Sequence, residues 1–392
     1  MRPLDGITVI TLEHAIAAPF CTRQLADLGA RVIKIERPGS GDFARDYDTR
    51  VRGLASHFVW TNRSKESVTL DVKHAEARKI LGRLLECADV LVQNLAPGAA
   101  ARLGLGYAEL SERYPRLIVC DISGYGGDGP YAERKAYDLL IQSESGFLSV
   151  TGTPETPSKA GNSIADISAG MYAYSSILAA LLQRAKSGRG ARIDVSLLET
   201  MVEWMGFPLY YAFEGQAPPR RTGAAHATIY PYGPFRAGDG KLVMFGLQNE
   251  REWAVFCDKV LQQSALASDP RFASNAQRVA ARAELDHVIH EAIASLTAPE
   301  VIARLDAAGI ANARINEVAE VWDHPQLRAR GRWTEVGTPQ GRVPALRPPA
   351  GLDGVEPRMD PVPALGEHTD EVLGELGYSA ESIAALRAAR VV

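Results

Sequence analysis

Short β-branched runs alternate with helical patterns through the first third of the chain. Five runs rich in Val, Ile and Leu occupy residues 6–12, 31–36, 67–71, 90–93 and 117–122. Amphipathic stretches separate the runs, and one of these predicts a helix over residues 75–87. Strands that alternate with helices of this length are typical of a parallel sheet built from right-handed crossovers. The sequence therefore predicts an open α/β sheet.

A long helical pattern follows this region. Apolar residues recur every three or four positions along residues 164–183, which predicts one helix that ends near Gly188. Ser163 and Asp166 stand at its start in the S-x-x-D arrangement, which is typical of a capping box. A further strand is expected at residues 193–197.

The remainder of the chain predicts a second, smaller domain and a return to the first. The polar segment 216–223, with its adjacent prolines, is typical of a linker. Beyond it we expect a hairpin at 231–247, helices near 252–261, 282–296 and 299–308, an extended stretch at 338–363 and a helix pair at 369–389. The predicted domains are 1–200 (large, α/β), 201–224 (linker), 225–330 (small, α+β) and 331–392 (return segment with C-terminal helices packing on the large domain).

Charge and cysteine usage exclude several classes of function. The chain has 43 Lys and Arg against 47 Asp and Glu, and no basic block that would follow a nucleic-acid backbone. We find no apolar run of the length that a membrane helix needs and no signal peptide. The four cysteines are far apart, and the histidines lack metal-binding spacings. We expect a cytoplasmic protein that binds no nucleic acid, no membrane and no metal.

Two local patterns leave alternatives open. Residues 124–129 match G-x-G-x-x-G after a predicted strand. This motif indicates either a dinucleotide-binding site or a plain glycine turn, and the Pro130 that follows favours the turn. Asp166 lies in the first turn of a long helix, where the dipole keeps a carboxylate ionised. That position is equally typical of an acid that only stabilises the helix.

Five motifs in order carry a resemblance to a known family. They lie at residues 25–42, 93–98, 124–130, 166–170 and 366–370. Together they resemble the family III coenzyme A transferases of the CaiB/BaiF type, and the overall pattern is most similar to the branch that transfers CoA from succinyl-CoA to C5 dicarboxylates. The resemblance implies a Rossmann-like large domain. It also implies an interlocked, ring-like homodimer and a CoA thioester as substrate, with no tightly bound cofactor and no metal.

The resemblance also implies roles for individual residues. The family nucleophile, an Asp that opens the helix after the glycine loop, matches Asp166. Its CoA contacts match His14, Arg37, Leu70, Lys73, Asn94, Leu95, Arg102 and Lys135. The basic members of this set suit the phosphates of CoA, although each of them is also an ordinary surface residue in the absence of the resemblance.

Departures from the family pattern discriminate among its activities. The racemases have a catalytic His where this chain has Tyr137, and they are the alternative to transfer. The oxalate enzymes have Gln at Ile16, Trp at Tyr47 and a glycine-rich loop at residues 226–232, none of which is kept. These departures indicate a different acceptor acid, and the resemblance to the succinyl-CoA branch implies a C5 dicarboxylate such as itaconate, mesaconate or citramalate.

The expected mechanism makes further demands on the site. A second carboxylate on the acceptor needs a cation, for which Arg45, Arg52 and His226 are candidates. Asp138 is a candidate for orienting the nucleophile. Backbone amides at the start of the Asp166 helix and in the loop 124–129 are expected to stabilise the oxyanions.

Overall fold

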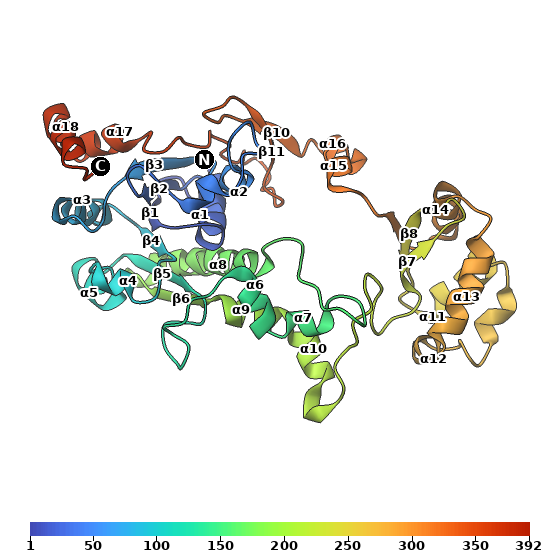
Figure 1. Cartoon of the computed structure of the whole chain (residues 1–392). Coiled ribbons are helices and arrows are strands. Elements are labelled where there is room, and N and C mark those ends of the chain that lie inside the picture. Colours follow the sequence, from blue (N-terminus) through green and yellow to red (C-terminus); the bar gives the residue numbers. More distant parts are fainter. The chain divides into compact units, whose positions relative to one another are not determined.

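The computed structural model describes residues 1–392 and divides into two compact units (Figure 1). Unit 1 comprises Met1–Gly146, Ala160–Met205 and Gln326–Val392, and unit 2 comprises Phe147–Lys159 and Gly206–Pro325. Residues 147–159, which we had placed in the large domain, thus belong to unit 2, as do residues 206–224 of the predicted linker. One reason is direct bonding within unit 2, since Arg221 donates to the carbonyl of Thr153 and the amide of Gly223 to that of Gly152.

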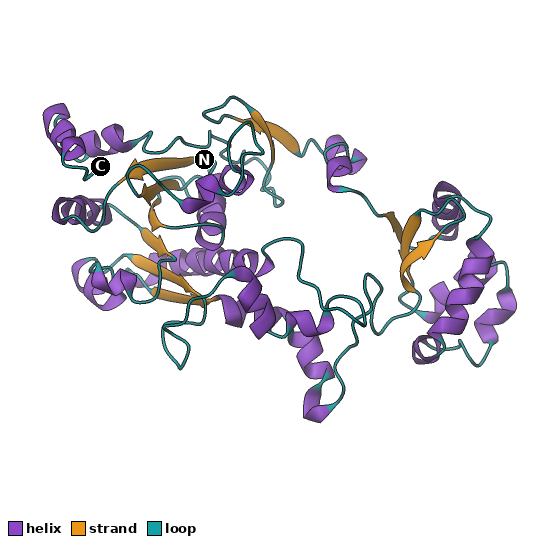
Figure 2. Cartoon of the chain, viewed as in Figure 1, coloured by secondary structure: helices purple, strands orange, loops and turns teal.

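Unit 1 is built on a six-stranded parallel sheet, as predicted (Figure 2). The spatial order of its strands is β3-β2-β1-β4-β5-β6. The strands are β1 (Thr8–Leu12), β2 (Arg31–Glu36), β3 (Lys65–Thr69), β4 (Val90–Gln93), β5 (Ile118–Ser123) and β6 (Arg192–Ser196). The third of these begins two residues earlier than predicted. The chain order reverses between β1 and β4, and ligands of such sheets bind in the crevice beyond the carboxyl ends of the strands at this point.

Helices cover both faces of this sheet. The long helices are α1 (Ala17–Asp27), α3 (Ala75–Glu86) and α8 (Ile164–Ser187), and α8 ends at the left-handed Gly188 as expected. The shorter elements are η1 (Phe43–Asp46), α2 (Ser56–Thr61), α4 (Ala99–Arg102), α5 (Tyr107–Arg113), α6 (Asp138–Glu144), α9 (Leu197–Trp204), α17 (Thr369–Glu375) and α18 (Ala380–Ala388). Apolar residues of α3, α5, α17 and α18 form one core with the strands, whereas α1 and α8 pack against each other and against the sheet.

Helix α8 is also long and apolar enough, by length and composition alone, to cross a membrane, which our sequence analysis did not anticipate. This is weak evidence, because the core helix of a soluble protein passes the same test. In this structure α8 contacts α1, β5 and β6, which is the packing expected of a core helix.

Unit 2 is a small α+β unit with its own apolar core. Its antiparallel sheet has the order β7-β8-β9, and the predicted hairpin forms β7 (Tyr232–Arg236) and β8 (Leu242–Gly246). The third strand, β9 (Asn312–Arg314), was not predicted. The other elements are α7 (Phe147–Val150), α10 (Gly206–Tyr211), η2 (Phe213–Gly215), α11 (Glu250–Val255), η3 (Phe256–Val260), η4 (Ser264–Ser268), α12 (Asn275–Ala280), α13 (Arg282–Ile293), α14 (Ala298–Ala308) and α15 (Val318–Val321). The predicted helix at 252–261 is in fact α11 followed by the π-helical η3.

The return segment contains more structure than the sequence predicted. After α16 (Pro325–Ala329), strands β10 (Trp333–Val336) and β11 (Val343–Leu346) pair as an antiparallel hairpin, so the stretch from 338 is not wholly extended. Thr338 and Gly341 close the turn with two backbone hydrogen bonds. The predicted helix pair at 369–389 is confirmed as α17 and α18.

The close approach of α1 and α8 depends on Gly170. A Cβ at this position would lie 2.7 Å from the Ala17 carbonyl oxygen, which is backbone and cannot swing away. We therefore expect Gly170→Ala to lower the free energy of unfolding by about 2 kcal/mol, as measured by urea denaturation. In the control Gly374→Ala, on the exposed surface of α17 with nothing within 4 Å, stability should stay the same or rise. Equal stability of the two variants would contradict this packing.

Candidate active site

Asp166 lies in the first turn of α8, where another carboxylate caps the helix. Oδ1 of Asp138 accepts hydrogen bonds from the amides of Ala165 at 2.7 Å and Asp166 at 3.2 Å. Ser163 occupies the N-cap position without a side-chain hydrogen bond, so the predicted capping box does not form. The cap is instead supplied by the first residue of α6.

Asp138 is itself held in place by a buried amide side chain. Nε2 of Gln142 donates to Oδ2 of Asp138 at 2.6 Å, and Oε1 of Gln142 accepts from the amide of Ala160 at 2.9 Å. Gln142 is fully buried. Both oxygens of Asp138 are therefore engaged, and the group is fixed against the start of α8.

This environment makes Asp166 an unusually basic carboxylate. Burial, followed by the negative charge of Asp138, raises the pKa of Asp166 to about 7. A pKa near neutrality keeps a large fraction of the group ionised at pH 7 while increasing its basicity. Acids with such pKa values are typical of catalytic sites. The position in the first turn of α8 does not explain the raised pKa, because the helix dipole there would lower it.

Several of the expected oxyanion donors are already engaged within the chain. The first four amides of α8 donate to the Asn162 carbonyl, to Asp138 twice, and to the Ser163 carbonyl. In the glycine loop, the amides of Gly126 and Gly127 donate to Ser123 and Asp194. These six amides therefore have partners within the chain, and the expectation for the rest of the loop stays a prediction.

The glycine motif has a packing role instead. A Cβ on Gly124 would lie 2.2 Å from Cβ of Ala136, so only glycine lets the segment that leads to α6 pass at this point. The carbonyl of Gly124 also accepts from the amide of Leu198 at the start of α9. The loop thus helps to place Asp138, and the plain turn is the better interpretation of the motif.

Two of the predicted CoA contacts meet where the strand order reverses. His14 follows β1 and Asn94 follows β4. The amide of His14 donates to Oδ1 of Asn94 at 2.8 Å, and Nδ2 of Asn94 donates to the His14 carbonyl at 2.9 Å. The crevice at this edge is where ligands of doubly wound sheets bind.

The other predicted CoA contacts follow the carboxyl ends of neighbouring strands. Arg37 follows β2, is exposed, and lies close enough to His14 for its charge to help lower the pKa of the imidazole, although burial is the larger cause. Leu70 follows β3 and is buried in the core, and its amide and carbonyl are bonded to the Glu36 carbonyl and the Val72 amide, so this structure does not expose it for a CoA contact. The remaining predicted contacts are partly or fully exposed in loops or short helices at this edge: Lys73, Leu95, Arg102 and Lys135.

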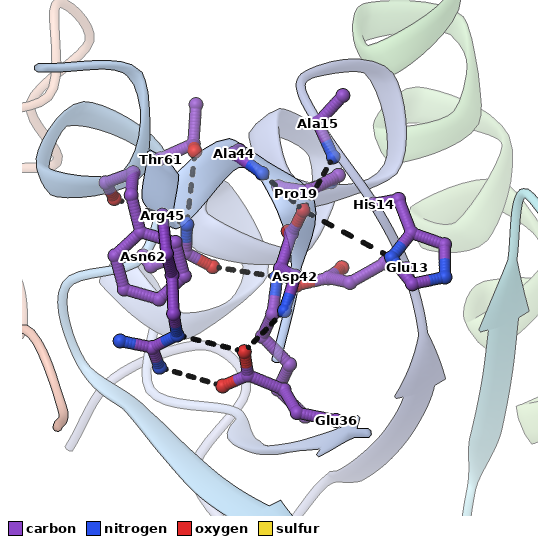
Figure 3. A network of polar contacts seen from close by, with 12 residues as sticks. Glu13, His14, Ala15, Pro19, Glu36, Asp42, Ala44, Arg45, Thr61 and Asn62 are labelled. Atoms are coloured by element: carbon purple, nitrogen blue, oxygen red, sulfur yellow. Dashed lines mark hydrogen bonds and ion pairs between the residues drawn. The ribbon is translucent and has the colours of Figure 1, made fainter. Parts of the chain in front are cut away.

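Two of the three candidate cations for a second carboxylate have other partners. The guanidinium of Arg45 makes a two-point ion pair with buried Glu36, at 2.6 and 2.9 Å, and stacks over Phe58 (Figure 3). Nδ1 of His226 accepts the amides of Thr228 and Ile229. Arg45 and Nδ1 of His226 are therefore already occupied by partners within the chain.

The third candidate is separate from these networks. Arg52 is exposed in a turn with a φ of 53°, and its guanidinium lies beside Gly341 in the β10–β11 turn. The structure does not bring it into contact with Asp166.

Aromatic side chains lie near Asp166. Burial raises the pKa of the Tyr47 phenol, and the charges of Asp42 and Asp166 add to this effect, so Tyr47 lies within electrostatic range of Asp166. Tyr137 directly precedes α6 and is 70% exposed. Ile16, at the N-cap of α1, is buried and contributes to the floor of this region rather than to its surface.

Sequence reasoning missed several charged and polar residues beneath this site. Glu13 and Lys34 are fully buried, as is Asp42, and Gln142 is the buried support of Asp138. A signal for two of them was present, because Lys34 interrupts an apolar strand and Glu13 directly follows one. Charges in such positions are paired when buried.

Comparison with known proteins agrees with this geometry. The model of CoA-transferase family III matches residues 4–369 of the chain. The chain belongs to this family. It is 34% identical to human succinyl-CoA:glutarate CoA-transferase over 398 residues, which is 100% of this chain and 90% of that protein. It is 32% identical to the succinyl-CoA–D-citramalate CoA-transferase of Chloroflexus aurantiacus over 403 residues, which is 100% of this chain and 98% of that protein.

A solved structure has the same fold. The crystal structure of a CaiB/BaiF family protein from Brucella suis superimposes with a TM-score of 0.83 and 36% identity, covering 96% of this chain and 99% of that one. The family III protein described here is thus an acyl-CoA:carboxylate CoA-transferase, and CoA thioesters are substrates of its family. The racemase alternative is not favoured, since the named relatives are transferases and Tyr137 stands where a catalytic His would be needed.

The charge of Asp138 gives a prediction for the pH dependence. Replacing Asp138 with Asn removes a negative charge beside Asp166, so the pKa of Asp166 should fall, while Asn still caps the helix. The acid limb of the kcat/KM profile, which falls as pH drops through the pKa of Asp166, should move to lower pH by about one unit. The control Glu133→Gln, an exposed acid on the approach to α6, should leave the limb in place. If kcat/KM of Asp138→Asn fell at the same pH as in the wild type or at a higher pH, the proposed effect of Asp138 on the pKa of Asp166 would be contradicted.

Proposed function

We propose that this CoA-transferase moves CoA from succinyl-CoA to a C5 dicarboxylate, with Asp166 as the covalent nucleophile. The observation that carries the proposal is the Asp166 carboxylate, with its pKa raised to about 7, at the start of α8. The human and Chloroflexus relatives are named for succinyl-CoA as donor and for a C5 dicarboxylate, glutarate or citramalate, as acceptor, which supports the choice of substrates. The acceptors proposed are glutarate, citramalate, itaconate and mesaconate.

The chemistry exchanges one thioester for another. The Asp166 carboxylate attacks the succinyl thioester carbonyl, which forms a mixed anhydride and releases CoA thiolate. The thiolate attacks the aspartyl carbonyl of the anhydride, which leaves an aspartyl-CoA thioester and free succinate. The acceptor carboxylate then repeats the two steps in reverse, so that bonds formed and broken balance without an external energy source.

The residues at the carboxyl edge of the sheet are proposed to bind CoA. His14 follows β1, and Asn94 and Leu95 follow β4, at the point where the strand order reverses. Arg37, Lys73, Arg102 and Lys135 supply exposed positive charge for the three phosphates of CoA.

A second group of residues is proposed for the acyl and acceptor ends of the substrates. Tyr47 and Tyr137 lie near Asp166, and Asp138 holds the start of α8. With Arg45 engaged by Glu36, Arg52 is the remaining candidate cation for the distal carboxylate.

An interlocked homodimer completes the proposal. Large apolar side chains are exposed along α9, α10 and η2, a pattern that marks a surface covered by a partner. They are Trp204, Phe207, Leu209, Tyr210, Tyr211 and Phe213, with exposures between 46% and 82%.

The nucleophile is tested by removing it. Asp166→Ala should fold, because it relieves a partly buried charge, and should lose at least ~1,000-fold in transfer rate, as is usual for the loss of a nucleophile. Hydroxylamine added with succinyl-CoA should convert the wild-type intermediate to a hydroxamate on the peptide that carries Asp166, detected by mass spectrometry. The control Asp128→Ala, an exposed acid of the glycine loop, should retain transfer and labelling. Substantial transfer by Asp166→Ala, or a hydroxamate on another residue, would refute this role.

The acceptor is tested with a panel of acids. With succinyl-CoA as donor, kcat/KM should be highest for the C5 dicarboxylates and at least tenfold lower for oxalate and for butyrate, which lack the length or the second carboxylate. In deuterated solvent, a 2-methylacyl-CoA should acquire no deuterium at its α-carbon. Deuterium exchange without any need for an acceptor acid would establish the racemase alternative instead.

A further inference from the structure

The motif at residues 25–42 contains charges that CoA contact does not account for. Lys34, in the middle of β2, and Asp42, before η1, are both fully buried. Nζ of Lys34 lies 2.7 Å from Oδ2 of Asp42. Nζ of Lys34 also lies 3.1 Å from Oδ1 of Asn62 and 3.4 Å from Oε1 of Glu13. This set of contacts leaves Asp42 with one oxygen that faces away from Lys34.

That second oxygen joins two different segments (Figure 3). Oδ1 of Asp42 accepts from the amide of Ala15 at 3.1 Å and from the amide of Ala44 at 2.9 Å. Ala15 belongs to the loop between β1 and α1 and has a φ of 61°, a left-handed conformation that a non-glycine residue rarely adopts. Ala44 belongs to η1. One carboxylate oxygen therefore holds the strained loop and the start of η1 at a fixed separation.

The two segments carry side chains that stack on each other. His14 precedes Ala15, Phe43 precedes Ala44, and their rings are stacked with centroids 5.2 Å apart. Phe43 is 50% exposed and also contacts Tyr47, which lies within electrostatic range of Asp166. Nδ1 of His14 is buried without a hydrogen-bond partner, and the nearest Asp42 oxygen is 3.9 Å away. The stacked pair is therefore placed by its backbone and not by a bond to the imidazole.

We infer that Asp42, fixed by Lys34, is a positioning residue that sets the His14–Phe43 pair as one wall of the acyl-CoA site. The inference rests on the proposed function, and it adds a specific consequence. Loss of Asp42 should weaken acyl-CoA binding and leave the KM for the acceptor acid unchanged. A purely structural role would instead lower the fraction of folded enzyme, which reduces kcat and leaves both KM values unchanged.

The main experiment compares Asp42 with a buried carboxylate of similar environment. Asp27, 2% exposed, pairs with Arg63 and Arg23 at the other end of the 11-residue helix α1. Asp42→Ala should raise the KM for succinyl-CoA at least tenfold and leave the acceptor KM within twofold. Asp27→Ala should lower the Tm but leave both KM values within threefold.

A conservative variant provides the rescue. Asp42→Asn keeps one oxygen for the amides of Ala15 and Ala44, but its NH2 group then faces the Lys34 ammonium, so the ion pair and its hydrogen bond are both lost. Its Tm should fall, whereas its KM for succinyl-CoA should stay within threefold of the wild-type value. An unchanged KM in Asp42→Ala, or an equal rise in Asp27→Ala, would overturn the inference.

Two further measurements keep the test decisive. If Asp42→Ala does not fold, Phe43→Ala removes one exposed wall and should raise the KM for succinyl-CoA at least fivefold, whereas Asp46→Ala on the same turn should not.

If wild-type enzyme transfers no CoA, the proposed function fails. Calorimetric titration of CoA then still tests the inference, since Asp42→Ala should bind CoA at least tenfold more weakly than wild type and Asp27→Ala should not. Equal binding by the Asp42 and wild-type proteins would refute it, as would an unchanged KM in Phe43→Ala.

Discussion

A balanced set of buried charges supports the carboxyl edge of the large sheet. Glu13 follows β1, Lys34 lies in β2, Lys65 begins β3, and Asp42 precedes η1, so four separate segments meet in one network. Burying an ion without a partner is very costly, and removing one member of a buried pair typically costs about 3–5 kcal/mol. The opposing charges within the network hold the pKa of Glu13 down at about 2 despite its burial. The position of each segment is thus tied to that of the others.

Asp166 occupies a different electrostatic environment from this network. Glu13 is surrounded by cations, whereas burial and the neighbouring Asp138 raise the pKa of Asp166. Two buried carboxylates therefore differ because of their neighbours: the pKa of Glu13 is lowered, which suits a structural ion pair, whereas the pKa of Asp166 is raised, which makes it more basic. Asp138 combines two effects, since it caps α8 through two amides and increases the basicity of the group that it caps.

The sheet was predictable because parallel strands that are covered on both faces are continuous apolar runs. The long helix α8 was predictable because its apolar residues recur with helical spacing up to a glycine, Gly188. Asp166 and the CoA-contact positions came from the family resemblance. The cap by Asp138 was not predictable, since it comes from 28 residues upstream and no local spacing marks it. The ion pair of Arg45 with Glu36, which joins two different elements, is likewise not marked by any local spacing. Strand β9 has three residues, too few for a clear alternation.

Unit 1 combines segments that are distant in the sequence. The amide of Thr69 donates to the Thr369 hydroxyl, and the amide of Asp71 to the Val391 carbonyl, so β3 and the turn after it are completed by α17 and by the residues after α18. During synthesis on the ribosome, β3 must therefore wait for the Thr369 hydroxyl, 300 residues later in the chain. Unit 2 ends at Pro325 and emerges before the last segment of unit 1. Unit 1 is consequently the last part of the nascent chain to close its core.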